Sequence, residues 1–224
     1  FTVDKELVIL SKDGNIKNRI HLGNYANLTP LSPDGTKIVY NDENDQIRLI
    51  NSDGSNRRKL TSNEHGYFNP AWSPDSSKIV ISTLTGELKV IDITSDKIFD
   101  LDKGDNPSWS PDSQYILYSQ LERVDGYKII SADLYLVKYD GSQKIPQTTT
   151  KDELEGYANW SLDGGKIAFG SYINGNLFIA PVRTALPVKE SEAESLLQLG
   201  SVEKMQHRSL EKWKGTIHPS FSQQ

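Results

Sequence analysis

The chain has 224 residues and a formal net charge of −5 at pH 7, with 25 Lys and Arg against 30 Asp and Glu. This acidic balance argues against a nucleic-acid partner, which requires a basic surface. The absence of cysteine excludes disulfides and thiolate chemistry. The longest apolar runs, such as residues 7–10, have the length of a strand and are too short for a transmembrane helix.

One sequence phrase occurs four times and organises the chain. Its copies are LTPLSPDGTKIVY at 28–40, NPAWSPDSSKIVIST at 69–83, NPSWSPDSQYILYSQ at 106–120 and YANWSLDGGKIAFGS at 157–171. The turn aspartates of the four copies are 41, 37 and 51 residues apart, at Asp34, Asp75, Asp112 and Asp163. Repeats of this period are typical of the four-stranded blades of a β-propeller.

Partial repeats lie at both ends of the chain. Residues 6–20 predict the outer two strands of a blade, and residues 1–3 the end of its second strand. Residues 216–222 resemble a first strand. Two arrangements fit these partial blades. They join as one closing blade, which would remove exposed sheet edges, or the chain is part of a larger ring.

Each copy predicts a strand, a tight turn and a second strand. Pro74 presets φ for the turn, Ser73 and Asp75 offer oxygens to its N–H groups, and Gly35 supplies a positive φ in the first copy. Two further strands follow each of the first three copies, because apolar residues alternate and turn residues separate them, in segments 46–61, 87–101 and 133–149. The Trp of each copy or its substitute is expected to lie buried between blades, at Leu31, Trp72, Trp109 and Trp160.

Two segments depart from the regular repeat. Residues 121–133 lengthen the third copy and predict a projecting hairpin with a turn at Asp125-Gly126, or a plain extension of two strands. Residues 186–215 lose the two-residue alternation and place apolar residues at helical spacing, which predicts one or two helices. Those helices could pack on the side of the propeller or dock a partner; a disordered linker is the third alternative.

The sequence carries no recognisable catalytic or metal-binding motif. It contains no G-x-S-x-G nucleophile elbow, and its four histidines lack the spacing of metal ligands. The segment 42–46, DENDQ, lacks the Gly and terminal Glu that close a calcium-binding EF-hand loop. We therefore predict no catalytic residue, no metal ligand and no cofactor.

The phrase W-S-P-D-(G/S)-x-(K/Y)-I resembles the TolB-like β-propeller repeat, which also occurs in the tricorn protease and in the propellers of prolyl-oligopeptidase-like enzymes. The chain departs from this pattern at Leu31, where Trp is expected, and at Leu162, where Pro is expected. The resemblance implies an all-β propeller of four complete blades with partial blades at both termini. It also implies a periplasmic or exported bacterial location. The repeat is specific for a fold and does not specify a function.

Varied loops with aromatic side chains are the first candidates for a contact surface. In a propeller, the loops that enter each blade and the loops between second and third strands share one face, called the top face below. The Ser-Pro-Asp turns share the bottom face. Binding energy concentrates in aromatic and arginine side chains. The candidate partner-binding residues are Tyr25, His65, Tyr67, Phe68, Arg123, Tyr127 and Tyr157. In the alternative interpretation, Tyr67 and Tyr157 only plug the mouth of the central channel.

These observations predict propeller blades over residues 1–185, a helical or irregular segment over 186–215 and a further strand in 216–224. The expected function is a non-catalytic scaffold that binds a protein partner, with no nucleic acid and no transmembrane segment. The alternative is a propeller that gates substrate entry to a prolyl-oligopeptidase-like or tricorn-like peptidase whose catalytic domain lies outside this chain. A nucleophile elbow in the flanking sequence would distinguish the two.

Overall fold

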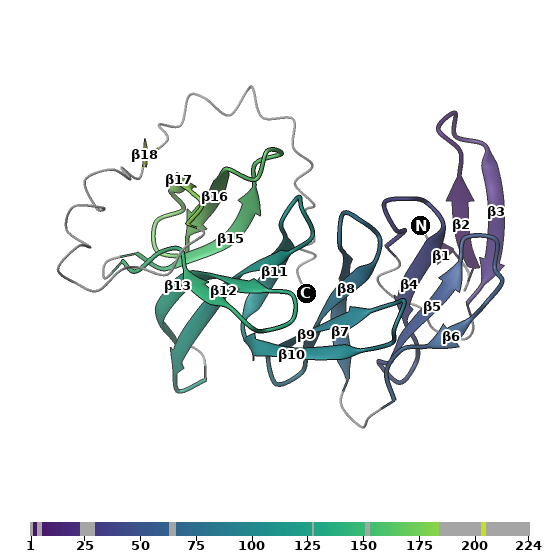
Figure 1. Ribbon diagram of the computed structural model, residues 1–224, viewed down its shortest axis with the longest axis horizontal. Coiled ribbons are helices and arrows are strands. Elements are labelled where there is room, and N and C mark those ends of the chain that lie inside the picture. The colour runs from purple at the N-terminus through teal and green to yellow at the C-terminus, as the bar shows by residue number, and fades with distance from the viewer. Residues whose placement is uncertain are drawn as a thin grey trace.

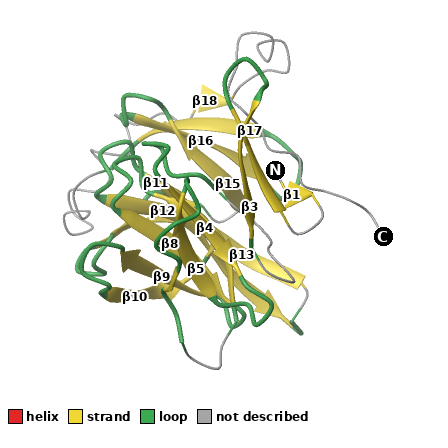
Figure 2. Ribbon diagram, turned by 90° about the vertical axis from the view of Figure 1, so that its right-hand side faces the viewer, coloured by secondary structure: helices red, strands yellow, loops and turns green. Residues whose placement is uncertain are grey.

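The computed structural model describes residues 2–3, 6–22, 30–62, 66–126, 128–150, 153–183 and 203–204. Within these ranges every regular element is a β-strand and no helix is present (Figure 2). All strand pairs are antiparallel. The predicted fold class is confirmed for this part of the chain.

The strands form five sheets in chain order, here called blades 1 to 5. Blade 1 contains β1 (Thr2–Val3), β2 (Glu6–Leu10) and β3 (Ile16–His21), and blade 2 contains β4 (Lys37–Asn41), β5 (Ile47–Asn51) and β6 (Arg58–Lys59). Blade 3 contains β7 (Tyr67–Trp72), β8 (Lys78–Thr83), β9 (Glu87–Asp92) and β10 (Ile98–Lys103). Blade 4 contains β11 (Asp105–Trp109), β12 (Tyr115–Val124), β13 (Lys128–Lys138) and β14 (Lys144–Pro146). Blade 5 contains β15 (Glu155–Trp160), β16 (Lys166–Ser171), β17 (Leu177–Pro181) and β18 (Glu203–Lys204).

The blades follow one another along an arc, from β1–β3 at one end to β15–β17 at the other (Figure 1). The described strands do not close this arc into a ring. In blade 2 the first strand is reduced to an isolated bridge between Leu31 and Ile38. The fourth strand of blade 5 comes from the segment predicted to be helical, because β18 pairs with β17. The other residues of 186–215, and all of 216–224, lie outside the described residues.

The insertion of the third copy lengthens two strands of blade 4. The strands β12 and β13 pair from Tyr115 and Lys138 out to Val124 and Lys128. Asp125 and Gly126 follow with φ of 54° and 75°, the left-handed values that an Asp-Gly hairpin turn uses. The insertion is therefore an extended hairpin that continues the second and third strands.

Apolar clusters between consecutive blades form the core. Trp72 and Trp109 are 9% and 8% exposed, as predicted, and each packs in the cluster between its own blade and the preceding one. Trp160 is half-buried against the cluster between blades 4 and 5. Leu31 differs from the prediction, because it is 47% exposed. Blade 1, which precedes it, ends at β1 on that side, and no described strand lies inward of β1 to cover this side chain.

Each tryptophan also ties its blade to the one before it through its indole N–H. The Nε1 of Trp72 donates to the carbonyl of Pro30 at 3.0 Å, and that of Trp109 to the carbonyl of Ala71 at 3.0 Å. The Nε1 of Trp160 donates to the carbonyl of Ser108 at 3.3 Å. The indole thus fills the space between blades while its polar atom is satisfied.

The Ser-Pro-Asp turns provide a second link between neighbouring blades. The Oγ of Ser76 accepts a hydrogen bond from the N–H of Asp34 at 3.1 Å, and the Oγ of Ser113 accepts one from the N–H of Asp75 at 3.0 Å. Ser76 and Ser113 both have φ of 61°. The corresponding residue of blade 5 is Gly164, which has no hydroxyl, so this link is missing between blades 4 and 5.

Candidate functional site

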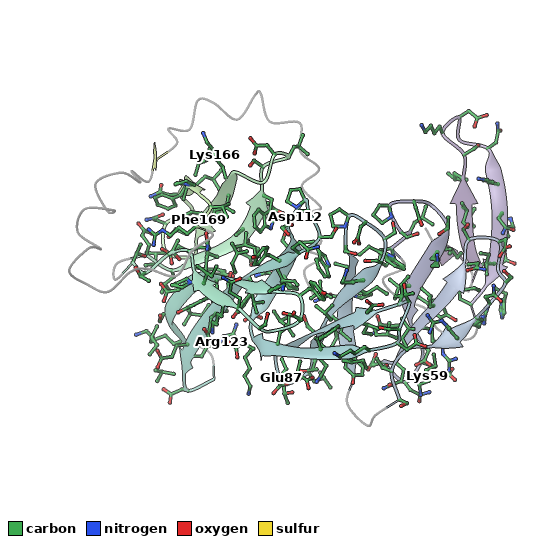
Figure 3. The ribbon with its side chains drawn as sticks, in the orientation of Figure 1. Lys59, Glu87, Asp112, Arg123, Lys166 and Phe169 are labelled. Carbon is green, nitrogen blue, oxygen red and sulfur yellow. The ribbon has the colours of Figure 1, made fainter. Side chains whose placement is uncertain are left out.

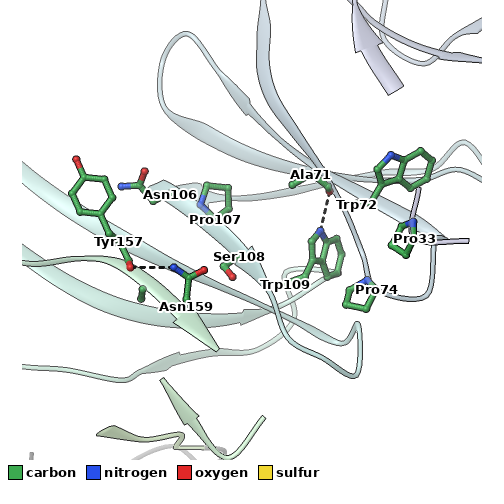
Figure 4. A pocket seen from close by; sticks show the side chains of 11 residues that line it. Pro33, Ala71, Trp72, Pro74, Asn106, Pro107, Ser108, Trp109, Tyr157 and Asn159 are labelled. Carbon is green, nitrogen blue, oxygen red and sulfur yellow. Dashed lines mark hydrogen bonds between the residues drawn. The ribbon is translucent and has the colours of Figure 1, made fainter. Parts of the chain in front are cut away.

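The inner strands of the arc line an open groove of about 690 Å³. Its apolar lining includes the rings of Pro33, Pro74, Pro107, Trp72 and Trp109. Asn106, Asn159 and the exposed Tyr157 add polar groups. Figure 4 shows Tyr157 and Asn106 at one end of the groove and Trp72, Pro33 and Pro74 at the other. None of the described side chains that line the groove carries a formal charge.

A bulge recurs in each inner strand, three residues before the tryptophan. The register shifts there in β7, β11 and β15, and the residue at that point has a positive φ. Asn69 has φ of 51°, Asn106 of 54° and Tyr157 of 54°. Asparagine tolerates the left-handed conformation, whereas a bulky aromatic residue rarely adopts it. Blade 5 therefore carries backbone strain at the one bulge where a tyrosine has taken the place of asparagine.

The strained Tyr157 is held against a second tyrosine. Its ring centroid lies 5.2 Å from that of Tyr172, and its side chain is 54% exposed. The Tyr172 hydroxyl accepts a hydrogen bond of 3.3 Å from Nδ2 of Asn106 in blade 4. Burial raises the pKa of Tyr172 to about 12, so this phenol stays neutral. Gly156 makes the packing possible, because a Cβ there would lie 2.3 Å from the Tyr172 ring.

The predicted contact residues fall in different places. Tyr157 lies in the groove and is exposed. Arg123 is exposed near the tip of the β12–β13 hairpin, 3.9 Å from the Asp105 carboxylate, and is not part of the groove lining (Figure 3). Tyr67 is 2% exposed and belongs to the core between blades 2 and 3, and Phe68 is half-buried. Tyr25, His65 and Tyr127 lie outside the described residues.

Sequence reasoning missed two residues that the structure brings beside Tyr157. Asn106 and Asn159 lie in β11 and β15 and present amide groups to the groove. The sequence does contain a pattern that points to Asn106. Asn106 stands three residues before Trp109, and Asn69 stands three residues before Trp72. The positive φ that this position adopts could not be recognised from residue types alone.

The faintly calcium-like loop at 42–46 is a closed turn. The Asp42 carboxylate pairs with Nε of Arg48 at 2.6 Å and accepts hydrogen bonds from the N–H groups of Asn44 and Gln46. Across the described ranges, no group of three His, Cys, Asp or Glu side chains could hold a metal ion. The same ranges contain no helix long and apolar enough to cross a membrane.

Comparison with known structures identifies the architecture. The chain is similar to a TolB from Agrobacterium tumefaciens, with a TM-score of 0.55 and 20% identity over 91% of this chain and 74% of that one. It is also similar to the tricorn protease, with a TM-score of 0.62 and 13% identity over 78% of this chain and 20% of that one. At these identities the likeness shows the β-propeller fold.

One curated protein is similar in sequence. The Dipeptidyl-peptidase 5 of Porphyromonas endodontalis is 32% identical over an alignment of 76 residues, and the match covers 30% of this chain and 11% of that protein. The chain thus spans only a small part of this relative. A family model described as the TolB beta propeller domain matches residues 2–191. Together with the five consecutive antiparallel sheets, this match shows that the chain belongs to the TolB beta propeller domain family.

Proposed function

We propose that this chain is a non-catalytic β-propeller scaffold that binds a segment of a protein partner in its inner groove. The observation that carries the proposal is the strained, exposed Tyr157 beside the uncharged groove. Strained residues persist where the surrounding structure holds them, and they cluster at binding and catalytic sites. An aromatic residue kept half-exposed at such a position is a natural anchor for a partner.

The lining of the groove indicates the chemistry of the partner segment. Proline and tryptophan rings favour apolar and proline-containing peptides, which lose little conformational freedom on binding. The amides of Asn106 and Asn159 can both donate to and accept from a peptide backbone. A charged side chain would be desolvated there without a counter-charge, so we expect the central residues of the bound segment to be uncharged.

We also propose that the scaffold works in a bacterial cell-envelope or exported complex. Membership of the TolB beta propeller domain family and the likeness to the TolB from Agrobacterium tumefaciens support this location. A fractionation of cells that produce the native gene tests it. Recovery of the protein with cytosolic markers only would contradict the proposed location.

Selection of peptides from a displayed random library tests the groove. The chain is immobilised, and the Tyr157→Asn chain serves for counter-selection, because asparagine occupies this bulge in blades 3 and 4 without loss of the fold. We expect selected peptides to bind the Tyr157→Asn chain about 30-fold more weakly, the level of a hot spot. Asp53→Asn, in an exposed turn, is the matched control and should bind like the wild type.

Two results would contradict the groove as the site. One is the absence of any peptide that discriminates the wild type from Tyr157→Asn. The other is full binding by Tyr157→Asn together with loss of binding when residues 123–128 are trimmed, which would move the site to the β12–β13 hairpin. Trimming is expected to leave groove binding unchanged, because the hairpin does not contribute to the groove lining.

The second candidate function is a propeller that gates substrate entry to a peptidase. It is favoured by the 76-residue similarity to Dipeptidyl-peptidase 5 and the structural likeness to the tricorn protease. In this case the catalytic groups come from residues outside this chain, since the chain has no nucleophile elbow. Sequencing of the complete gene decides between the two: an adjoining α/β segment with G-x-S-x-G supports the gate, and further repeats support the scaffold.

A further inference from the structure

A carboxyl group is buried inside the molecule at the start of β15, the inner strand of blade 5. Glu155 is 1% exposed. The Thr150 hydroxyl donates a hydrogen bond to its Oε1, while Oε2 is buried and has no hydrogen-bond partner among the described residues. A buried carboxyl group without a cation beside it is more stable when it carries a proton.

A second unsatisfied oxygen lies on the face of blade 4 that packs against blade 5. Ser119 is 1% exposed, and its Oγ has no hydrogen-bond partner in the described parts of the chain. Ser119 is paired with Leu134, whose side chain packs against blade 5, so the two side chains share that face of blade 4. In the repeat, Ser119 of blade 4 corresponds to Asn41 of blade 2, and Glu155 of blade 5 corresponds to Tyr67 of blade 3. The side-chain amide of Asn41 donates a hydrogen bond to the carbonyl of Tyr67.

The charges around Glu155 oppose its ionisation. Asp133, on β13, is a like charge that acts on Glu155, and the carboxylate of Asp133 accepts a hydrogen bond from the N–H of Thr150. Among the other ionisable groups nearby, Asp105 and Arg123 face each other at 3.9 Å, Glu153 accepts a hydrogen bond from Asn174, and Tyr172 stays neutral. Glu122 and Lys128 lie on the extended hairpin, and Lys138 and Lys166 lie at strand ends. Burial raises the pKa of Glu155 to about 7; the Thr150 hydrogen bond opposes this shift and Asp133 adds to it.

Glu155 is linked to the groove through only one residue. Gly156 follows it and packs so closely on the Tyr172 ring that no side chain fits there. Tyr157 comes next, with its strained backbone and its ring in the groove. A displacement of Glu155 from its buried position is therefore transmitted directly to Tyr157.

We propose that Glu155 is a proton-operated latch on the groove: its neutral form stays buried and holds Tyr157 in place, and its ionised form leaves the site and releases residues 155–157. The groove then binds its partner more tightly below neutral pH than above it. The binding half of this inference rests on the proposed function, whereas the release of the strand does not.

Hydrogen exchange measured by mass spectrometry tests the latch without a partner. The folded-state pKa lies above the ordinary 4.5, so the stabilisation is complete below about pH 4.5 and is lost as pH rises through about 7. After correction for intrinsic exchange rates, we expect amides of residues 155–160 to lose on the order of 10- to 100-fold of protection between pH 5.5 and pH 8. Glu155→Gln should keep its protection at pH 8, and the control Glu153→Gln should behave like the wild type.

Unchanged protection of 155–160 in the wild type, or an equal loss in Glu155→Gln, would overturn the latch. If Glu155→Gln does not fold, the wild-type titration decides. A fall in protection between about pH 4.5 and pH 7 that levels off above pH 7 is expected in 155–160 and not in the equivalent strand, residues 67–72. A groove-binding peptide should then bind more weakly at pH 8 in the wild type only. A pH-independent affinity would overturn the coupling to binding and leave the proposed function intact.

Discussion

At the scale of single residues, the position three before the tryptophan sets one inner strand apart from the others. Asn69 and Asn106 adopt positive φ where asparagine is tolerated, and Tyr157 adopts the same φ where a tyrosine is strained. The contact between the rings of Tyr157 and Tyr172 offsets this strain, because such aromatic pairs stabilise the folded state by about 0.5–1.5 kcal/mol. Backbone strain of this kind costs about 1–3 kcal/mol, so strain and ring packing are of similar size and opposite sign.

Replacing Tyr157 with asparagine is expected to change the free energy of unfolding by less than about 1 kcal/mol, because relief of backbone strain offsets loss of the ring contact. Tyr157→Ala loses the ring without gaining a residue suited to positive φ, so we expect it to be less stable than Tyr157→Asn. Urea denaturation of both variants checks this order. A Tyr157→Asn protein destabilised by several kcal/mol would show that the ring is a core element.

Trp109 tests the link between blades. Trp109→Ala should lower the free energy of unfolding by about 3–5 kcal/mol, as expected for a large buried aromatic residue. Trp109→Phe should cost about 1–3 kcal/mol, because the Ala71 carbonyl loses its indole donor. The matched Trp160→Phe should cost less, since its hydrogen bond is longer and its ring is less buried. Equal costs for the two phenylalanine variants would contradict this account.

At the scale of elements, the Ser-Leu-Asp-Gly turn of blade 5 has leucine where the three Ser-Pro-Asp turns have proline. Leu162 is fully exposed, at 100%, where the other blades have Pro33, Pro74 and Pro111. Leu162→Pro is expected to raise the free energy of unfolding by about 0.4–1 kcal/mol, because proline restricts the unfolded chain and fits the turn. Leu162→Ala, measured alongside by chemical denaturation, should change it by less than about 0.5 kcal/mol.

Gly164 offers a second test in the same turn. A Cβ at this position would lie 3.7 Å from Pro111, so a serine fits. Its hydroxyl could accept from the N–H of Asp112, as Ser76 and Ser113 accept from Asp34 and Asp75. Gly164→Ser should be more stable than Gly164→Ala by about 0.5–1.5 kcal/mol, since both carry the same backbone strain and only serine forms the bond. Equal stabilities would show that the link does not form.

At the scale of the whole molecule, the described turns lie on two opposite sides of the arc. Asp112 and Lys166 mark the turns of the bottom face, and Glu87 and Arg123 lie on the opposite side (Figure 3). The blades are held together by clusters between sheets and by the tryptophan and serine links, so the arc is a rigid frame for the groove. Its open inner side leaves the groove accessible.

The purified chain is expected to show no turnover of peptide, ester or glycoside substrates, because no nucleophile, base and oxyanion set can be assembled from its motifs. Assays with fluorogenic substrates of each class check this. Asp53→Asn and Tyr157→Asn serve as matched variants, because activity from a contaminating enzyme would be the same in both variants and in the wild type. Activity that persists through purification and changes with one of these substitutions would refute the non-catalytic assignment.

The sequence by itself determined the blades, because their signals are local. Strand alternation, the Ser-Pro-Asp turns and the Asp125-Gly126 hairpin each depend on residues close together in the chain, and the 37- to 51-residue period repeats them. The burial of Trp72 and Trp109 follows from the same repeat. These features could be predicted without knowing how the blades pack.

Only the tertiary structure decided the groove and the latch, because both arise from contacts between blades. Tyr67 is a core residue and Tyr157 is exposed, and the two stand five and three residues before their tryptophans. The bulge that brings Tyr157 into the groove and the burial of Glu155 beside Thr150 appear only in the folded chain. Burial of a side chain is a property of its surroundings in space, and a local pattern does not contain it.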